Sequence, residues 1–185
     1  MVVPGIRDLD RAEHWYRVSL ERRDEHDRIG RGSCLGQLGS IAGSRFSEAR
    51  SAGRPQEELL RYLDEAAERY REALDLLPPE AIEELAAAHG QLGSLYGDAG
   101  DLDRARTHYD ESIRLAEAAG KLHDAAETRF NVAFDLAQAG RLQDALGYAR
   151  SALRGFEACG PAAAPDFEQT RQLMEQIQTT MAESG

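Results

Sequence analysis

Three primary amides hold the same place in three similar segments of this 185-residue chain. Gln37, Gln91 and Asn131 each stand directly before a recurring leucine or valine. A primary amide can both donate to and accept from the backbone of an extended peptide, so this amide ladder predicts peptide recognition. The alternative is that these are ordinary polar residues of a solvated surface, and the sequence favours neither interpretation over the other.

No other set of side chains has the spacing of a catalytic, cofactor or metal site. The histidines show no i, i+4 pair and no neighbouring cysteine, so we interpret them as surface or interhelical residues. They are His14, His26, His89, His108 and His123. Gly120-Lys121 lacks the flanking residues of a phosphate loop, and acidic pairs such as Glu57-Glu58 are typical of solvated helix faces. We therefore expect a protein that is not an enzyme, with no catalytic residue, no metal and no cofactor.

Composition and charge exclude several classes of partner. The chain has 22 basic and 33 acidic residues, a net charge of -11, which argues against binding to nucleic acid or anionic membranes. No apolar run approaches the roughly 20 residues of a membrane span, and Met1–Ile6 does not have the layout of a secretory leader. Two lone cysteines, Cys34 and Cys159, suit a reducing compartment without a disulfide. A cytoplasmic location is expected.

The elements that carry these residues repeat along the chain. A shift of 40 residues superimposes Leu92, Gly100, Leu102, Ala105 and Ser112 on Val132, Gly140, Leu142, Ala145 and Ala152. The pentapeptide GQLGS at 36–40 recurs at 90–94. Self-similarity at a fixed period is the signature of a helical repeat array.

The order of the repeated residues resembles the tetratricopeptide repeat (TPR). Leu92-Gly93 is followed by Tyr96, and then by Ala105 and Tyr109. The chain is similar to the long-helix bacterial members of this family, whose period lies near 40. The resemblance implies an all-α fold, a right-handed α-solenoid of antiparallel helix pairs with about eight helices.

Helix punctuation divides the chain into segments. Gly100-Asp101 and Gly140-Arg141 predict turns within repeats, and Gly120 and Gly160-Pro161 predict the ends of second helices. Asp166 and Gln169 predict a capping box at the start of the last helix. The single TPR-like domain, 1–185, is expected to contain an orphan second helix at 8–24, a repeat at 30–77, repeats at 80–119 and 122–158, and a capping helix at 166–182. The missing first half before 8–24 predicts a segment of a larger array.

One repeat is longer than the others. The shift from Leu9 to Leu63 is 54 residues, and the excess predicts two extra helical turns on each arm of the 30–77 hairpin, with its tip at 53–55. Antiparallel pairing is then expected to bring Phe46 and Ala49 against Leu59, Leu60 and Leu63. Such an arm is either a spacer or a contact surface.

Glycines recur inside two predicted helices, where each costs roughly 1 kcal/mol relative to alanine. They are Gly36, Gly39 and Gly43 in one helix and Gly90, Gly93 and Gly97 in the other. Something must compensate for this cost. They serve either the close approach of a neighbouring helix or a groove shallow enough for a ligand backbone.

The resemblance also implies a binding surface. In the family, one stripe of each first helix lines a concave groove. Here that stripe contains Gln37, Ser40, Ser44, Gln91, Ser94, Asp98, Asn131, Phe134 and Gln138. We expect a scaffold that binds a peptide or protein partner in this groove, as a sensor or docking module of a larger signalling or regulatory protein. The alternative is a structural or self-association module that forms a homo-oligomer through the long hairpin or the N-terminal helix.

Overall fold

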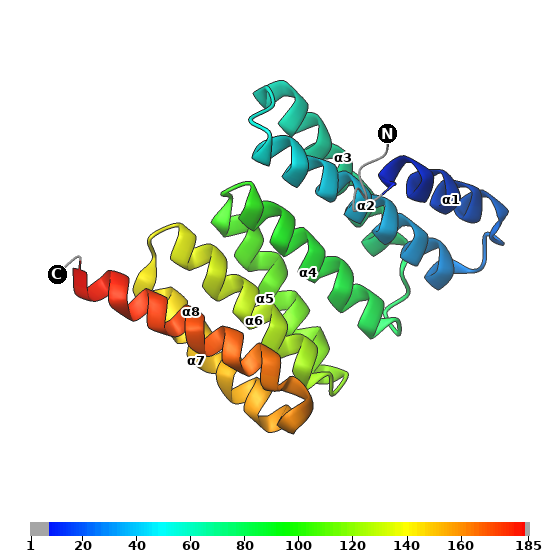
Figure 1. Cartoon of the computed structure of the whole chain (residues 1–185). Coiled ribbons are helices and arrows are strands. Elements are labelled where there is room, and N and C mark those ends of the chain that lie inside the picture. Colours follow the sequence, from blue (N-terminus) through cyan, green and yellow to red (C-terminus); the bar gives the residue numbers. More distant parts are fainter. Residues whose placement is uncertain (1–7, 184–185) are drawn as a thin grey trace. The chain divides into compact units, whose positions relative to one another are not determined.

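A computed structural model describes residues 8–183 of the chain, and this part is helical with no strand. Met1–Ile6, in which no leader was expected, lies outside the described residues. The α-helices are α1 (Leu9–Arg22), α2 (Arg28–Ser51), α3 (Gln56–Leu76), α4 (Ile82–Asp98), α5 (Leu102–Ala118), α6 (Leu122–Gln138), α7 (Leu142–Cys159) and α8 (Ala164–Glu183). A short 3₁₀ helix, η1 (Gly160–Ala163), precedes α8. The expected all-α solenoid of helix pairs is confirmed (Figure 1).

The chain divides into two compact units, Met1–Glu84 and Leu85–Gly185. The first unit contains α1, α2 and α3, and the second contains most of α4 together with α5 to α8. Within each unit consecutive helices pack against one another (Figure 1). The α-helices from α2 to α8 bury residues in these contacts, whereas α1 has no buried residue.

The predicted glycine turns are present, and they share one geometry. Gly53, Gly100, Gly120 and Gly140 all have positive φ, between 63° and 80°. After each glycine, the next backbone N–H donates to a carbonyl five residues earlier, as from Asp101 to Tyr96 at 2.9 Å. This is the Schellman arrangement, in which a left-handed residue satisfies the last carbonyls of a helix.

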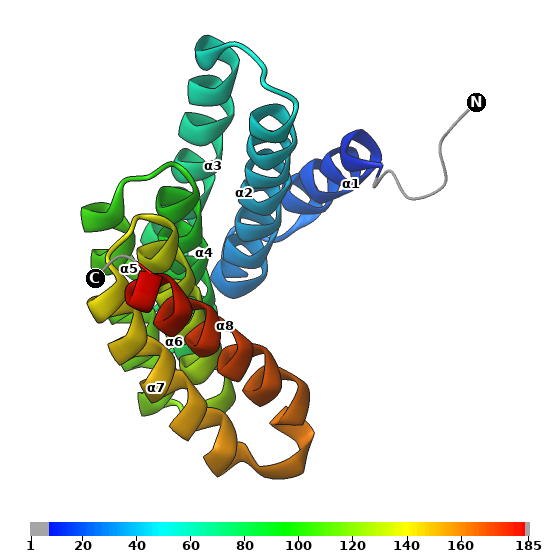
Figure 2. The same ribbon diagram turned by 60° about the vertical axis from the view of Figure 1, so that its left-hand side comes forward.

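The long hairpin of the first unit consists of α2, with 24 residues, and α3, with 21. By comparison, α4, α5 and α6 have 17 residues each. Figure 2 shows the two long helices side by side. Gly53 lies in the turn between the end of α2 at Ser51 and the start of α3 at Gln56. Phe46 and Ala49 are buried, and Leu59 and Leu63 are half-buried. Leu60, which was also expected in this contact, is 48% exposed.

Most of the repeated glycines in α4 make room for side chains of neighbouring helices. A Cβ atom at Gly93 would lie 2.5 Å from the Tyr109 ring, and one at Gly97 would lie 1.9 Å from the Asp135 carboxylate. In α2, a Cβ at Gly39 would meet the Tyr70 ring at 2.8 Å. Close helix approach therefore compensates for the intrinsic cost of these glycines.

The helix α8 covers α7 at the end of the second unit. Its Thr170, Leu173 and Ile177 are buried, as a capping helix requires. The capping box predicted at Asp166 is wrong, because η1 leads directly into α8 and the helix already includes Asp166. The Asp166 carboxylate instead lies 3.0 Å from Nε2 of His123 on α6.

Candidate functional site

The predicted groove residues of the second unit lie on α4 and α6. Gln91 of α4 is exposed, and Ser94 and Asp98 are half-buried. On α6, Asn131 is half-buried, Gln138 is exposed and Phe134 is 46% exposed. The residues that follow two of the amides, Leu92 and Val132, are buried at 0% and 4% exposure. Packing therefore uses the apolar stripe of each helix and leaves Gln91 and Phe134 at the surface.

A direct contact brings α4 and α6 together. The Asp135 carboxylate occupies the space that a side chain at Gly97 would need. Asp98 follows Gly97 and Phe134 precedes Asp135 in the sequence, so the Gly97–Asp135 contact lies next to predicted groove residues of both α4 and α6. The residues on α4 and α6 thus belong to one pair of neighbouring helices.

Two of the predicted residues of α2 make hydrogen bonds within the first unit. Gln37 is exposed, but the Ser40 hydroxyl accepts a hydrogen bond from the Tyr70 hydroxyl at 3.1 Å. The Ser44 hydroxyl donates to the Ser40 carbonyl at 2.9 Å. Burial raises the pKa of the Tyr70 phenol, and the Ser40 contact opposes that shift. The Ser40 hydroxyl therefore links α2 to α3, whereas the Ser44 hydrogen bond lies within α2.

Ser94 and Asp135 share one partner, the phenol of Tyr109 on α5. Tyr109 donates a hydrogen bond to Asp135 at 2.9 Å, and Ser94 also contacts the hydroxyl. Burial first, and then the negative charge of Asp135, hold the pKa of Tyr109 well above its usual range. This cluster ties α4, α5 and α6 together, so Ser94 is also partly a structural residue.

The second unit also contains a groove that sequence analysis missed. It has a volume of about 390 Å³ and is formed by α5, α6 and α7. Its apolar floor and aromatic walls are Leu102, Ala105, Val132, Leu136, Tyr109 and Tyr148. None of the predicted groove residues lines it, because Asn131 and Phe134 lie on a different stripe of α6. The sequence feature that could have indicated this groove is Gly147, a glycine inside a helical repeat. In the structure nothing lies within 4 Å of its Cβ position.

Arginines surround this groove, but they already hold carboxylates. The pairs are Arg106–Asp110 at 3.6 Å, Arg129–Glu117, and Arg141–Asp144 at 2.6 Å. The Tyr148 hydroxyl is 3.4 Å from Asp110, and burial together with that charge raises its pKa. A rim of paired charges over an apolar floor suits contact with a polypeptide better than it suits selection of a small anion.

Two histidines that are distant in sequence meet between α4 and α5. Nδ1 of His89 lies 3.0 Å from Nδ1 of His108, and the His108 ring also stacks on Tyr96. The ring centroids are only 5.2 Å apart, so the two nitrogens point toward one another. The pair can hold one shared proton between its nitrogens, which matches the expected interhelical role. Among residues 8–183, no three His, Cys, Asp or Glu side chains gather as metal ligands do.

Both cysteines are free thiols, with Cys34 buried and Cys159 half-buried. Over the described range, no helix has the length and apolar character needed to cross a membrane.

Comparison with known proteins identifies part of the chain. None of the curated proteins matches the sequence. The solved structure of BtubC (BKLC) from P. vanneervenii is similar over 96% of this chain and 92% of that chain, at 18% identity and a TM-score of 0.46. That similarity is too slight to support an argument about role. The family model for the tetratricopeptide repeat matches residues 84–158, which confirms the resemblance inferred from the Leu92-Gly93 and Ala105 motifs. Residues 84–158 are thus similar to tetratricopeptide repeats, a kind of helix-pair repeat that suggests a protein–protein interaction scaffold.

Proposed function

We propose that this chain is a cytoplasmic scaffold that binds an extended peptide segment of a partner protein across α4 and α6. One observation supports the proposal most directly. Phe134 is 46% exposed although Val132 and Ala133, its neighbours on the same helix, are 4% and 0% exposed. A large aromatic side chain left at the surface beside polar groups is typical of an interaction anchor.

The amides provide the specificity of this surface. Gln91 and Asn131 lie on α4 and α6, the helices that meet at Gly97 and Asp135. Each amide can donate a hydrogen bond to the backbone of a peptide and accept one from it. Such contacts recognise an extended chain without requiring a charge in the ligand. The module then works without chemistry of its own, as a docking or sensor part of a signalling or regulatory protein.

The experiment compares two surfaces of the second unit. A peptide ligand is first selected from a random display library against the whole chain, and its affinity for surface variants is then measured by calorimetry. Alanine at Gln91 or Asn131 is expected to weaken binding by about 0.5–1.5 kcal/mol each, as for a lost hydrogen bond. Phe134→Ala is expected to cost more, about 2 kcal/mol, because aromatic anchors dominate binding energy.

A matched control addresses the α5–α7 groove. Gly147 lines the groove and has open space at its Cβ position, so Gly147→Leu is designed to place a side chain in the groove. Under our proposal this variant binds the peptide as the wild type does. Loss of binding in Gly147→Leu, with full affinity in the Gln91, Asn131 and Phe134 variants, would transfer the function to the α5–α7 groove.

The competing function is self-association. Trp15 of α1 is 58% exposed and Leu60 of the α2–α3 hairpin is 48% exposed, so both proposed contact elements present an apolar side chain. Sedimentation velocity across a range of concentrations separates the two functions. A dimer that dissociates when Trp15 or Leu60 becomes a polar residue, together with no peptide ligand from the library, would favour the self-association module.

A further inference from the structure

The first helix is attached to its unit without a buried side chain. None of the residues of α1 is buried, although α1 packs along α2. Leu9, Ala12 and Tyr16, the apolar positions expected to be partly uncovered, are half-buried, and Trp15 is 58% exposed. By contrast, α2 and α3 share a core of their own that includes Phe46, Ala66 and Tyr70. Apolar burial therefore stabilises α1 much less than it stabilises the α2–α3 hairpin.

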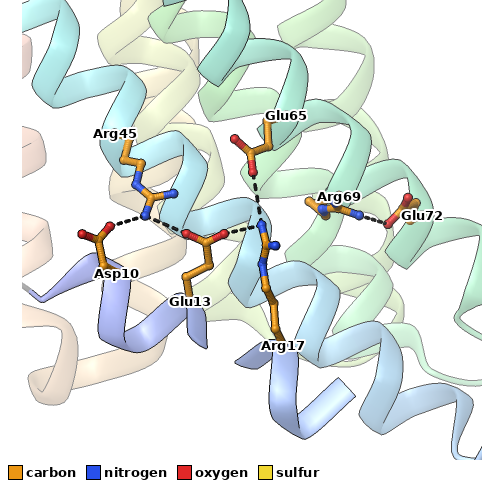
Figure 3. A network of polar contacts seen from close by, with 7 residues as sticks. All are labelled: Asp10, Glu13, Arg17, Arg45, Glu65, Arg69 and Glu72. Atoms are coloured by element: carbon orange, nitrogen blue, oxygen red, sulfur yellow. Dashed lines mark hydrogen bonds and ion pairs between the residues drawn. The ribbon is translucent and has the colours of Figure 1, made fainter. Parts of the chain in front are cut away.

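Ion pairs join α1 to α2 and α3 (Figure 3). Nη2 of Arg45 on α2 lies 2.6 Å from Oδ1 of Asp10 and 2.7 Å from Oε2 of Glu13. The side chains of Arg45 and Glu13 are 18% and 17% exposed. Glu13 also pairs with Arg17, which lies 4.0 Å from Glu65 on α3. The Arg45–Glu13 pair is shielded on both sides and is therefore stronger than an exposed ion pair, whereas the Asp10 side chain is 93% exposed and adds less.

The C-terminal half of α1 covers a thiol. Nη1 of Arg31 donates to the Leu20 carbonyl at 3.2 Å, and Sγ of Cys34 is 3.5 Å from the Ser19 hydroxyl. Arg31, Cys34 and Arg45 lie on one side of α2, because spacings of 3 and 11 residues leave them within about 60° of one another around the helix axis. Cys34 is 4% exposed in this arrangement.

We infer that α1 is a latch that charge holds closed on α2, and that it opens locally while the α2–α3 hairpin stays folded. Opening breaks the contacts of Arg45 with Asp10 and Glu13, and it uncovers the side of α2 that contains Cys34. Elements with few buried apolar contacts belong to the low-stability end of local unfolding. Salt weakens attraction between charges, so ionic strength sets the fraction of open molecules.

The test follows the Cys34 thiol in the full chain with Cys159→Ser, so that one cysteine remains. An aromatic disulfide reagent labels the thiol at NaCl concentrations from about 0.01 to 1 M, a range that shortens the Debye length from about 30 Å to about 3 Å. Hydrogen exchange of α1 and α3 amides is measured by mass spectrometry on the same samples. We expect faster Cys34 labelling and faster α1 exchange at high salt, with α3 exchange unchanged.

Two variants test whether the Arg45 ion pairs hold α1 on α2. Arg45→Gln removes the guanidinium that bridges α1 and α2. It is expected to speed Cys34 labelling about tenfold or more even at low salt, because a hydrogen bond between charged groups is lost. Arg69→Gln is the matched control, because the Arg69–Glu72 pair at 2.9 Å lies within α3 and does not involve α1 (Figure 3). It is expected to label as the wild type does.

Two results would overturn the latch. If α3 exchange accelerates by the same factor as α1 exchange, the whole unit opens and α1 is no separate element. If neither salt nor Arg45→Gln changes Cys34 labelling, charge does not hold α1 in place. If Arg45→Gln does not fold, the salt series on the protein that keeps Arg45 still shows whether charge holds α1 in place.

Discussion

Tyr109 donates a 2.9 Å hydrogen bond to the Asp135 carboxylate, and so joins α5 to α6 inside the repeat segment. The same tyrosine ring fills the space beside Gly93 of α4, and it is only 2% exposed. One side chain therefore connects three consecutive helices of the second unit. Neither Asp135 nor its link to Tyr109 belongs to the motif by which the repeats were found.

Removing only the Tyr109 hydroxyl shows how much its hydrogen bond to Asp135 contributes to the free energy of unfolding. Tyr109→Phe keeps the ring against Gly93 but removes the donor to Asp135, a charged acceptor. We expect a loss of about 1.5–3 kcal/mol in the free energy of unfolding, the usual range for hydrogen bonds to charged groups. Urea denaturation followed by circular dichroism provides the measurement.

Tyr148→Phe is the control for that loss. The Tyr148 hydroxyl lies 3.4 Å from Asp110, at the limit of a hydrogen bond, on the open side of α7. Its removal is expected to change stability by less than about 0.5 kcal/mol. Equal effects of the two substitutions would show that the Tyr109–Asp135 bond has no special weight in the packing of α4, α5 and α6.

Two helical glycines are expected to respond in opposite directions to alanine. At Gly93 a Cβ would lie 2.5 Å from the rigid Tyr109 ring, so Gly93→Ala should destabilise the chain by about 1–3 kcal/mol. At Gly36 nothing lies within 4 Å, so Gly36→Ala should stabilise α2 by about 0.5–1 kcal/mol through helix propensity. Thermal melts of both variants provide the comparison, and a gain in stability for Gly93→Ala would contradict the packing role of that glycine.

Glycine turn signals and repeat spacing in the sequence predicted the helices well, because each repeat contains its own turn signals. Gly100, Gly120 and Gly140 are followed by helix starts, and the structure has turns at all three. The failures depend on contacts between residues distant in sequence. The His89–His108 pair and the α5–α7 groove arise only when consecutive helices stack, and the contact of Asp166 with His123 joins residues 43 positions apart. No periodicity within one helix encodes such pairings.

The repeat register makes its own prediction at Ala145. This residue of α7 is 0% exposed, and Ala105 holds the same place in α5 at 2% exposure. Ala145→Leu inserts a larger side chain where helices touch, so we expect a loss of about 1–3 kcal/mol in unfolding free energy. Ala87→Leu is the control, because Ala87 is exposed on α4 and its replacement should be nearly neutral. Equal melting temperatures for the two variants would show that the register is shifted.

The His89–His108 pair is expected to make stability depend on pH between about 7 and 5. Burial lowers the pKa of His89 below its ordinary value of about 6.5; nearby Glu111 opposes that shift and Arg114 adds to it. A histidine with a depressed pKa binds protons more readily in the unfolded chain, so its stabilising effect is complete above pH 6.5 and is lost as the pH falls. One such group changes the unfolding free energy by at most about 1.4 kcal/mol per pH unit.

A second cause acts in the same direction. With Nδ1 atoms 3.0 Å apart, one nitrogen can donate to the other, and protonation of the accepting Nδ1 would replace this hydrogen bond by a contact between two N–H groups. Urea denaturation at several pH values should therefore show a steeper loss of stability in the wild type than in His89→Gln. The control is His26→Gln, because the His26 side chain is 89% exposed and should leave the slope unchanged. If His89→Gln retains the full wild-type slope, the pH dependence comes from other groups and not from the half-buried histidine contact.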